Sequence, residues 1–561
     1  MTTSTTPPHR PATRPPARSL RLGALLAVAA LALLAGALVL LGVASGTTAS
    51  DAAAAGPGVV VPTEVPELTV AGITDGQLLG SADVTSATIR VRAAADMADA
   101  LRVLLDGEPV TTTGGAAVVD ADDLALLTDG AHTLEATVDD RGAVATRTIT
   151  FTLDTTAPTV ELPAVVETRG YDTALEVALR VTGATEVSAA GGEVELGDDG
   201  AATARFPEPP HVLAVTASDA AGNTTTSEMP VVVHFPGGRA VHTTPSAWRY
   251  EPKRAPIIEL LEAGRIDAVQ MDIKDEIGDV GWDTDVELAD LAGAEDFNRN
   301  FDMAAAIDQI HSHGARVIGR LVVYRDSRLA KWAWDQGRTD MVLQSTDGTP
   351  YQGRYGDYAF TNFANPEVQQ YNLDIALEAA EIGFDDVLYD YIRRPDGAIE
   401  DIVVPGLGER TPEEAVVEVM AAAYPLLRER RVWVGASVFG IAVDRPTQMA
   451  QDITLMAEHV DYVAPMVYPN HWGPGEYGVP VPEDAPYDIV ERSLTLYRDA
   501  LAGTDTALMP WLQDFGGYGE AEVRAQIDAT QAVTGGRSFL LWASSATYTH
   551  AALDPAGQRE P

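Results

Sequence analysis

A short apolar segment near the middle of the chain ends on an acidic residue. Residues 383–395 (GFDDVLYDYIRRP) follow a helix-like segment, continue as a strand and reach Asp390, with Pro395 shortly beyond. In a parallel barrel the carboxyl ends of the strands carry the catalytic groups, and an acid buried there is costly unless it is paired or used. Asp390 is therefore our first candidate for acid–base or nucleophilic chemistry. The alternative is a structural acid that pairs with Arg393 or Lys274.

The segment from Ala268 to Lys274 alternates in a way that sorts its side chains onto two faces. Positions 269, 271 and 273 are apolar and should face covering helices, so Asp272 and Lys274 should point into the barrel. The same alternation places Asp390 on the inner face of its own strand. Because these are the second and fourth strands, their inward residues fall in one layer, and the two aspartates could face a common pocket. Otherwise Asp272 orients Lys274 in an ionic network.

Strand and helix patterns alternate eight times after Gly237. Strands are expected at residues 240–246, 268–274, 316–324, 387–392, 432–438, 462–468, 507–512 and 537–543. Prolines stand near the expected helix starts and glycines just past the helix ends, where each is tolerated best. The pattern predicts a (β/α)8 TIM barrel over residues 237–561. The alternative, a doubly wound open sheet, should carry a glycine-rich loop after its first strand, which this sequence lacks.

Short β-rich runs separated by turn residues precede the expected barrel. They predict two all-β sandwiches, at residues 67–155 and 156–236. The junction DTTAP at residues 154–158 and the phrase ASDAAGN at 217–223 resemble bacterial immunoglobulin-like modules. Few aromatic residues occur in either unit. A spacer role is therefore favoured over carbohydrate or cell-wall binding.

The N-terminus has the pattern of a targeting segment. Residues 1–21 contain four arginines, residues 22–45 form an uncharged apolar run, and residues 46–66 form a linker rich in small residues. Positive charge before such a run directs the rest of the chain outward, and the run is long enough to span a bilayer. We expect a transmembrane helix that contacts the lipid bilayer and holds the protein at the cell membrane. The alternative is a cleaved signal segment and a secreted protein.

The composition excludes several functions. A net charge of -44 and an isoelectric point near 4.4 argue against nucleic acid as a partner. The chain has no cysteine, which excludes disulfides, thiolate metal sites and cysteine nucleophiles. No metal-ligand spacing stands out. We expect no metal, no cofactor and a monomer.

Four phrases in order resemble one bacterial family. They are AVQMDIKD at 268–275, GFDDVLYDYIR at 383–393, PMVYP at 465–469 and PWLQDF at 510–515. The chain is similar over residues 239–552 to a TIM-barrel family of putative glycoside hydrolase domains of otherwise unknown function. The resemblance implies the barrel and hydrolysis of glycosidic bonds, with no settled substrate. Arg394 departs from the family, whose members more usually carry an aromatic residue there.

Glycoside hydrolysis typically needs two carboxyl groups, an acid and a nucleophile or base. We expect Asp390 to act as nucleophile or transition-state stabiliser, Asp272 as its candidate partner and Asp514, at the end of the seventh strand, as the third candidate. Aromatic residues at strand ends suit sugar faces. The residues expected to bind the sugar are Lys274, Tyr324, Arg393, Tyr468, His471, Trp511, Gln513 and Trp542.

The sequence thus predicts an extracytoplasmic glycoside hydrolase acting on a polysaccharide or cell-envelope glycan. The rival hypothesis is a catalytically inactive barrel that binds glycan as a scaffold at the cell surface. An amidase or esterase is disfavoured because no nucleophile elbow and no plausible Ser-His-Asp set occur. The strand that ends on Asp390 also lacks the run of acids found in chitinase-like barrels.

Overall fold

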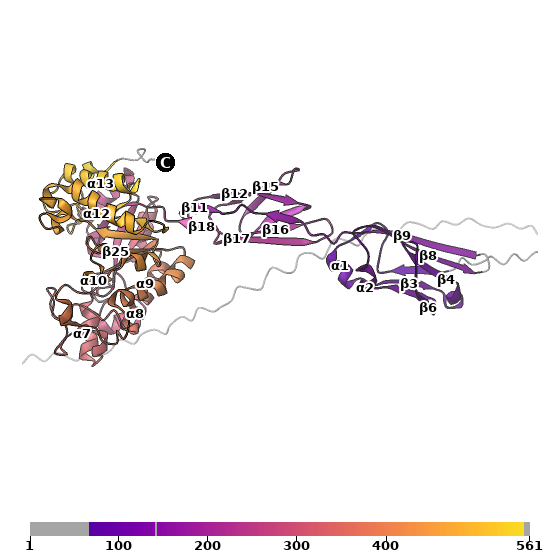
Figure 1. Cartoon of the computed structure of the whole chain (residues 1–561), viewed down its shortest axis with the longest axis horizontal. Coiled ribbons are helices and arrows are strands. Elements are labelled where there is room, and N and C mark those ends of the chain that lie inside the picture. Colours follow the sequence, from indigo (N-terminus) through magenta and orange to yellow (C-terminus); the bar gives the residue numbers. More distant parts are fainter. Residues whose placement is uncertain (1–66, 141–142, 555–561) are drawn as a thin grey trace, which may run out of the picture. The chain divides into compact units, whose positions relative to one another are not determined.

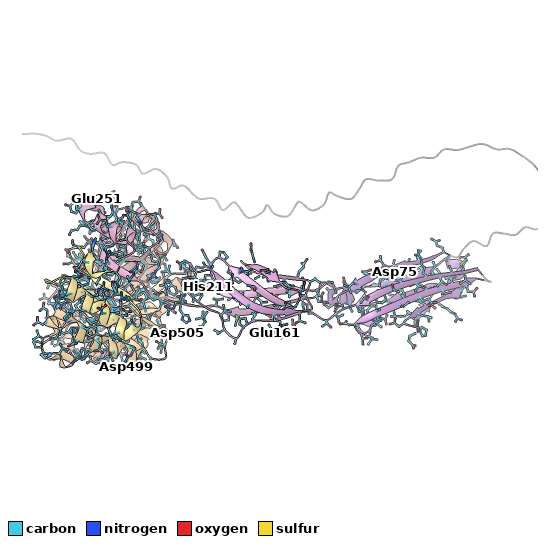
Figure 2. The ribbon with its side chains drawn as sticks, turned by 90° about the horizontal axis from the view of Figure 1, so that it is seen from above. Asp75, Glu161, His211, Glu251, Asp499 and Asp505 are labelled. Carbon is cyan, nitrogen blue, oxygen red and sulfur yellow. The ribbon has the colours of Figure 1, made fainter. Side chains whose placement is uncertain are left out.

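The computed structural model describes residues 67–140 and 143–554. Strands β1–β9 and β10–β18 build two all-β units, and the helices that follow belong to a β/α unit (Figure 1). Acidic side chains such as Asp75, Glu161, Glu251, Asp499 and Asp505 are exposed along all three units (Figure 2). A surface charge of one sign disfavours association between copies of a chain.

The first β unit packs two sheets around one apolar cluster. One sheet has the strand order β1-β3-β7-β6 and the other β2-β9-β8-β4-β5. Alternate residues of each strand, such as Ile89 and Val91 or Leu134 and Ala136, supply that cluster. Its elements are β1 (Leu68–Ala71), β2 (Gln77–Leu79), α1 (Ser81–Ser86), β3 (Ile89–Ala93), β4 (Leu101–Leu105), β5 (Glu108–Val110), β6 (Thr112–Thr113), β7 (Ala116–Val119), α2 (Ala121–Leu124), β8 (Gly130–Asp140) and β9 (Ala143–Leu153).

The second β unit is also built of antiparallel sheets. Its sheets have the orders β10-β12-β15-β14 and β13-β16-β17, and a parallel pair, β11 and β18, completes it. Strand β12 alternates buried and exposed residues throughout its length, as a sheet with one solvated face requires. The strands are β10 (Thr159–Glu161), β11 (Glu167–Arg169), β12 (Leu175–Thr182), β13 (Glu186–Ala189), β14 (Glu193–Leu196), β15 (Ala201–Phe206), β16 (Val212–Ser218), β17 (Thr224–Pro230) and β18 (Val232–His234).

The third unit is a closed barrel of eight parallel strand positions. Each strand pairs with the next in chain order, and the last pairs with the first. Met509 and Pro510 split the seventh position into two short strands, since proline cannot donate to the ladder. The strands are β19 (Arg239–Thr243), β20 (Ala268–Lys274), β21 (Arg316–Val322), β23 (Asp386–Asp390), β25 (Trp433–Phe439), β26 (Tyr462–Met466), β27 (Ala507–Leu508) with β28 (Trp511–Gln513), and β29 (Phe539–Trp542).

Helices fill the connections between the barrel strands. Helix α8 shows why they form where they do: Asn365 caps its first turn, Pro366 opens it, and Gly383, with a φ of 117°, ends it. The helices are α3 (Pro245–Arg249), α4 (Glu251–Glu262), α5 (Glu287–Ala292), α6 (Met303–His311), α7 (Ser327–Asp335), α8 (Pro366–Ile382), α9 (Pro412–Glu429), α10 (Pro446–Met449), α11 (Ile453–Ala457), α12 (Pro486–Ala500) and α13 (Glu520–Thr534). Strands β22 (Gln344–Ser345) and β24 (Ile402–Val403) form a separate antiparallel pair.

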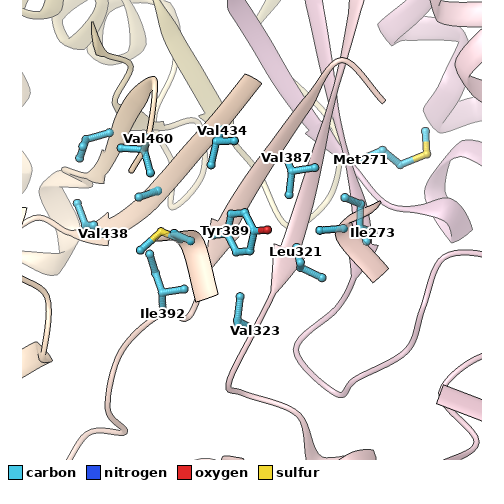
Figure 3. Close-up of a cluster of buried hydrophobic side chains, with 14 of the residues drawn as sticks. Met271, Ile273, Leu321, Val323, Val387, Tyr389, Ile392, Val434, Val438 and Val460 are labelled. Atoms are coloured by element: carbon cyan, nitrogen blue, oxygen red, sulfur yellow. The ribbon is translucent and has the colours of Figure 1, made fainter. Parts of the chain in front are cut away.

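Strand alternation separates the barrel interior from the helix layer. Ile273, Leu321, Val387 and Tyr389 lie in the apolar cluster between strands and helices (Figure 3). Leu388 belongs to a different cluster, together with other inward residues such as Ala268, Ile318 and Trp433. Side chains one position away from the helix-facing ones therefore point into the barrel. Because β20, β21 and β23 are neighbours in the sheet, their carboxyl ends lie side by side.

The predicted transmembrane helix requires a correction. Residues 22–45 lie outside the described residues, and within residues 67–140 and 143–554 no helix is both long and apolar enough to cross a bilayer. Helix α9, with 18 residues, is the longest described, but it carries charged residues at both ends. The described architecture is two β units followed by a barrel, without the membrane helix that the fold prediction included.

Aromatic contacts join the second β unit to the barrel. Phe235 stacks on Tyr462 with ring centroids 4.4 Å apart, and Tyr171 lies 4.6 Å from Trp433.

We predict that a chain beginning at Gly237 still folds, because the barrel is closed, but melts at a lower temperature than a chain beginning at residue 156. Each lost aromatic pair contributes about 0.5–1.5 kcal/mol beyond its buried area. Calorimetry on both chains tests this, and a shorter chain without a cooperative transition contradicts it.

Candidate active site

Three carboxylates converge on one buried guanidinium inside the barrel. Arg320 of β21 donates from Nε to Asp390 Oδ2 at 2.7 Å and from Nη1 to Asp272 Oδ1 at 3.1 Å. Its Nη2 donates to Glu276 Oε1 at 2.6 Å. The side chain of Arg320 is 3% exposed, those of the two aspartates 5%, and that of Glu276 29%. The acids of two strands and one loop are thus held at a single point, which solvent reaches mainly beside Glu276.

A bulge in β20 decides which residues of this strand join the cluster. Asp272 lies opposite Arg320, but the register shifts so that Lys274 lies opposite Leu321. Lys274 was expected to point into the barrel; instead its Nζ donates to Asp326 at 2.7 Å and to Asn372 of α8 at 2.8 Å. A bulge re-aims the side chains that follow it. Lys274 therefore lies in the helix layer, fully buried, and does not contact the carboxylate cluster.

Glu276, in the loop after β20, is not among the site residues that the sequence predicts. The preceding Asp275 folds the loop: its Oδ1 accepts hydrogen bonds from the backbone N–H groups of Ile277, Gly278 and Asp279 at 2.9–3.1 Å. This tight turn holds Glu276 over Arg320. The signal available in the sequence was Arg320, which lies at an inward position of the third strand.

The environment separates the protonation behaviour of two of these acids. Burial raises the pKa of Asp272 to about 7; the Arg320 guanidinium lowers it in part, and the charge of Glu276 adds to the rise. Burial also acts to raise the pKa of Glu276, but Arg320 outweighs it, by charge and by hydrogen bonding, and the pKa falls to about 2. Divergent pKa values in neighbouring carboxyl groups are the usual sign of an acid and an ionised partner.

One guanidinium holds the two aspartates side by side. Asp272 and Asp390 both bond to nitrogens of the planar group of Arg320. Hydrolysis of a glycosidic bond typically uses two such carboxyl groups. The second oxygen of Asp390 accepts the N–H of Tyr391 at 2.7 Å, so both of its oxygens have fixed partners.

A neutral histidine and a tryptophan border the cluster. His242 Nδ1 lies 2.5 Å from Gln270 Oε1 and 3.9 Å from Asp272 Oδ1. Burial, and then the charge of Arg320, lower the pKa of His242 to about 3, so the ring is neutral. The ring of Trp542 lies beside it, with centroids 4.2 Å apart and planes tilted by 32°, and Trp542 also contacts Arg320, whose guanidinium carbon lies 5.3 Å from the ring centroid. Trp542, one of the predicted sugar-binding residues, is thus beside the carboxylates.

The third predicted acid lies apart from the other two. Asp514 accepts hydrogen bonds from Thr549, at one oxygen from the backbone N–H and at the other from the hydroxyl, both at 2.7 Å. Burial raises its pKa and these hydrogen bonds oppose the rise. The neighbouring Gln513 accepts the N–H of Asn470 at 3.0 Å. Both residues tie loops together at the barrel end, and neither bonds to Arg320.

The remaining predicted sugar-binding residues divide into two groups. Tyr324 is fully buried in the helix layer near α9, and Trp511 is buried inside the barrel with its Nε1 on Ser437 at 2.9 Å. Tyr468 and His471 pack edge to face, with ring centroids 5.1 Å apart. Burial raises the pKa of Tyr468, and the charge of Asp390 raises it further. Tyr468 and His471 therefore belong to the region of the cluster. Trp511 borders the same region from inside the barrel, since its ring packs edge-on against Trp542 at 5.6 Å, whereas Tyr324 lies in the helix layer.

No metal site accompanies the acids. Within the part of the chain that the structure describes, no three His, Cys, Asp or Glu side chains are grouped so that they could hold a metal ion. The guanidinium of Arg320 occupies the position among the carboxylates that a cation would otherwise take. The site is thus a set of carboxyl groups around one guanidinium at the carboxyl ends of parallel barrel strands.

Comparison with known families agrees with this class. Residues 240–548 match the family described as "Putative glycosyl hydrolase domain", which covers more than half of the chain. The chain belongs to this family, as the four sequence phrases indicated. No curated protein matches the chain.

Solved structures give weaker likenesses. A hypothetical protein from Ruminiclostridium thermocellum ATCC 27405 is 24% identical, over 35% of this chain and 96% of that chain, with a TM-score of 0.31. The PgaB (BpsB) glycoside hydrolase domain from Bordetella bronchiseptica is 14% identical, over 55% and 95%, with a TM-score of 0.42. A beta-galactosidase from the psychrophilic Marinomonas ef1 is 13% identical, over 56% and 57%, with a TM-score of 0.38. Scores this low carry no argument about activity.

Removal of the central guanidinium should destabilise the fold. We predict that Arg320→Gln lowers the free energy of unfolding by about 3–5 kcal/mol, because it leaves buried carboxylates uncompensated. Burial without the cation raises their pKa values, so the variant regains stability on acidification and loses it as pH rises. Chemical denaturation at several pH values measures both effects.

The control is Arg498→Gln. Arg498 pairs with Asp499, and both side chains are exposed, by 51% and 63%, so a loss of less than about 1 kcal/mol is expected. Equal losses in the two variants would contradict a central role for Arg320.

Proposed function

We propose that this chain is a glycoside hydrolase whose acid–base machinery is the carboxylate cluster on Arg320. The single observation behind the proposal is that three carboxylates share one buried guanidinium at the carboxyl ends of barrel strands, with divergent pKa values for Asp272 and Glu276. Family membership supports the same reaction class. The proposed substrate is a polysaccharide or cell-envelope glycan.

The roles follow from the environment of each acid. Asp272, whose pKa is raised to about 7, is the proposed general acid that protonates the leaving oxygen. Asp390 is the proposed nucleophile or stabiliser of the oxocarbenium-like transition state, since two donors fix its orientation. Glu276, ionised and the most exposed of the three, balances Arg320. Trp542 and Tyr468 are the proposed sugar-stacking residues, and His471 is proposed beside them.

An extracytoplasmic location is proposed as well. Its support is the sequence alone: the basic N-terminus with the apolar run after it, and the strongly acidic remainder. Fractionation of cells that express the full chain tests this location.

A binding barrel without turnover is the second candidate. The observation that favours it is that every cluster acid already accepts a hydrogen bond from Arg320 before any ligand arrives. A protein that binds a glycan but releases no reducing ends from it would establish this reading.

The Asp390 assignment makes a direct prediction. Asp390→Asn keeps the shape but removes the charge that stabilises the transition state, so turnover should fall by about 10²–10³-fold or more while glycan binding persists. Reducing-end release and calorimetric binding measure the two quantities. Asp514→Asn is the matched control, because Asp514 bonds to Thr549 and not to Arg320. Near wild-type hydrolysis by Asp390→Asn would sink the assignment.

The pH profile tests Asp272 independently. Because Asp272 must be protonated to donate, kcat/KM should decline as pH rises above about 7, the pKa to which burial raises this carboxyl. Asp272→Asn should lack this alkaline limb and retain only low activity. Glu276→Gln removes a neighbouring negative charge that raises the pKa of Asp272, so its alkaline limb should move to lower pH. An unchanged limb in Asp272→Asn excludes Asp272 as the acid.

A further inference from the structure

Guanidinium groups and aromatic rings alternate beside the carboxylate cluster. We use the name arginine ladder for the six residues Arg354, Tyr355, Arg325, Tyr391, Arg393 and Phe439. Its contacts, from guanidinium carbon to ring centroid, are 4.8 Å (Arg354 on Tyr355), 4.2 Å (Arg325 on Tyr355), 5.0 Å (Arg325 on Tyr391), 4.9 Å (Arg393 on Tyr391) and 4.3 Å (Arg393 on Phe439). Each ring between two arginines is thus shared by both.

The ladder lies at the same end of the barrel as the acids. Arg325 follows β21, Tyr391 and Arg393 follow β23, and Phe439 ends β25, so the carboxyl ends of three adjacent strands supply it. Tyr391 is the residue next to Asp390 in the chain. Its φ of 50° lies in the left-handed region, which bulky residues rarely adopt. This strained conformation places the ring between Arg325 and Arg393.

The ladder carries more positive charge than its acidic neighbours neutralise. Asp396 lies 2.9 Å from Arg354 Nε and 3.7 Å from Arg393 Nη1, so one carboxylate serves two arginines. Arg325 has no carboxylate within 4 Å in the described part of the chain, and its Nη1 donates to the Tyr391 hydroxyl at 2.8 Å. The charge of Arg325 reaches Glu276 only at longer range. An excess of positive charge is therefore concentrated here, in a chain whose net charge is -44.

Rings in place of carboxylates leave a guanidinium available to a ligand. Cation–π contacts hold the face of the planar group, and the hydroxyl of Tyr391 accepts from only one N–H of Arg325, so other N–H groups of Arg325 remain for an oxyanion. The ladder runs from Arg354, whose side chain is 66% exposed, to Arg393, which is 2% exposed. Burial lowers the pKa of His471, and the charge of Arg354 lowers it further. The positive potential of the ladder therefore extends to the loop after β26.

We propose that the arginine ladder is a subsite for an anionic group on the glycan, either the carboxylate of a uronic acid or a sulfate or phosphate ester. The inference rests on the proposed function in that it takes a glycan as the ligand. The subsite lies beside Asp390, so the charged sugar would sit next to the bond that is cleaved. Oxyanions of all three kinds accept the paired N–H groups of arginine.

Binding of matched oligosaccharides tests the subsite without turnover. The full chain carrying Asp390→Asn is titrated by calorimetry with oligogalacturonides and with their methyl esters, which share the backbone but lack the charge. A sulfated galactan oligomer and its desulfated form make the second arm, and a phosphorylated mannan oligomer and its dephosphorylated form the third. We expect at least one anionic form to bind about tenfold or more tightly than its neutral counterpart, as charge-assisted hydrogen bonds imply. The arm that responds identifies the oxyanion.

Variants assign that preference to the ladder. Arg325→Gln and Arg354→Gln should each reduce it severalfold or more, and the exposed Arg354 can be changed without a threat to folding. Arg498→Gln is the control, since Arg498 is 51% exposed on α12 and pairs with Asp499. Equal affinity for charged and neutral forms in all three arms overturns the proposal, and so does a preference that survives both ladder substitutions.

The outcome for the proposed function is read separately, from hydrolysis by the wild-type chain. Charge-selective binding without any hydrolysis supports the anionic subsite and contradicts the proposed glycosidase activity. Hydrolysis of neutral glycans at the same rate as their charged counterparts supports the glycosidase activity and contradicts the proposed anionic subsite.

Discussion

The bond network of Arg320 is the interaction on which the barrel's functional end depends. Three acids from β20, the loop after it and β23 could not be buried together without a cation, because each isolated charge in a poorly solvated interior carries a large desolvation cost. One guanidinium meets all three through different nitrogens. Its planar fork fixes both their distance and their orientation. The geometry that makes the cluster tolerable is therefore the same geometry that makes it chemically capable.

Much of this arrangement could be predicted from residue alternation. The eight strands were predicted within a few residues, and the inward positions of Asp272 and Asp390 followed from a period of two. The bulge after Asp272 could not be predicted that way, because one shifted residue reverses every later side chain. For that reason Lys274 was expected among the acids but lies in the helix layer, whereas Glu276 was not predicted and bonds to Arg320.

The predicted sugar-binding residues show a second limit of sequence reasoning. The position of a residue at a strand end does not determine how deeply its side chain lies within the barrel. Trp511 and Trp542 lie on the last two strand positions. Trp511 is 2% exposed and hydrogen-bonded to Ser437, whereas Trp542 contacts Arg320. Arg393 contacts the ring of Tyr391, two residues before it in the chain, and also the ring of Phe439 in β25. The contact with Phe439 joins distant segments and leaves no trace in local periodicity.

The barrel thus holds its arginines in two physically different ways. Carboxylates surround Arg320, so its single positive charge is shared among three internal acids. Aromatic rings hold Arg325, so its position is fixed while its charge stays uncompensated by any carboxylate within 4 Å in the described part of the chain. The consecutive residues Asp390 and Tyr391 connect the two environments. A ligand meets a strong change of potential over that short distance, and a local field of this kind orients a charged group even on a protein whose surface as a whole repels it.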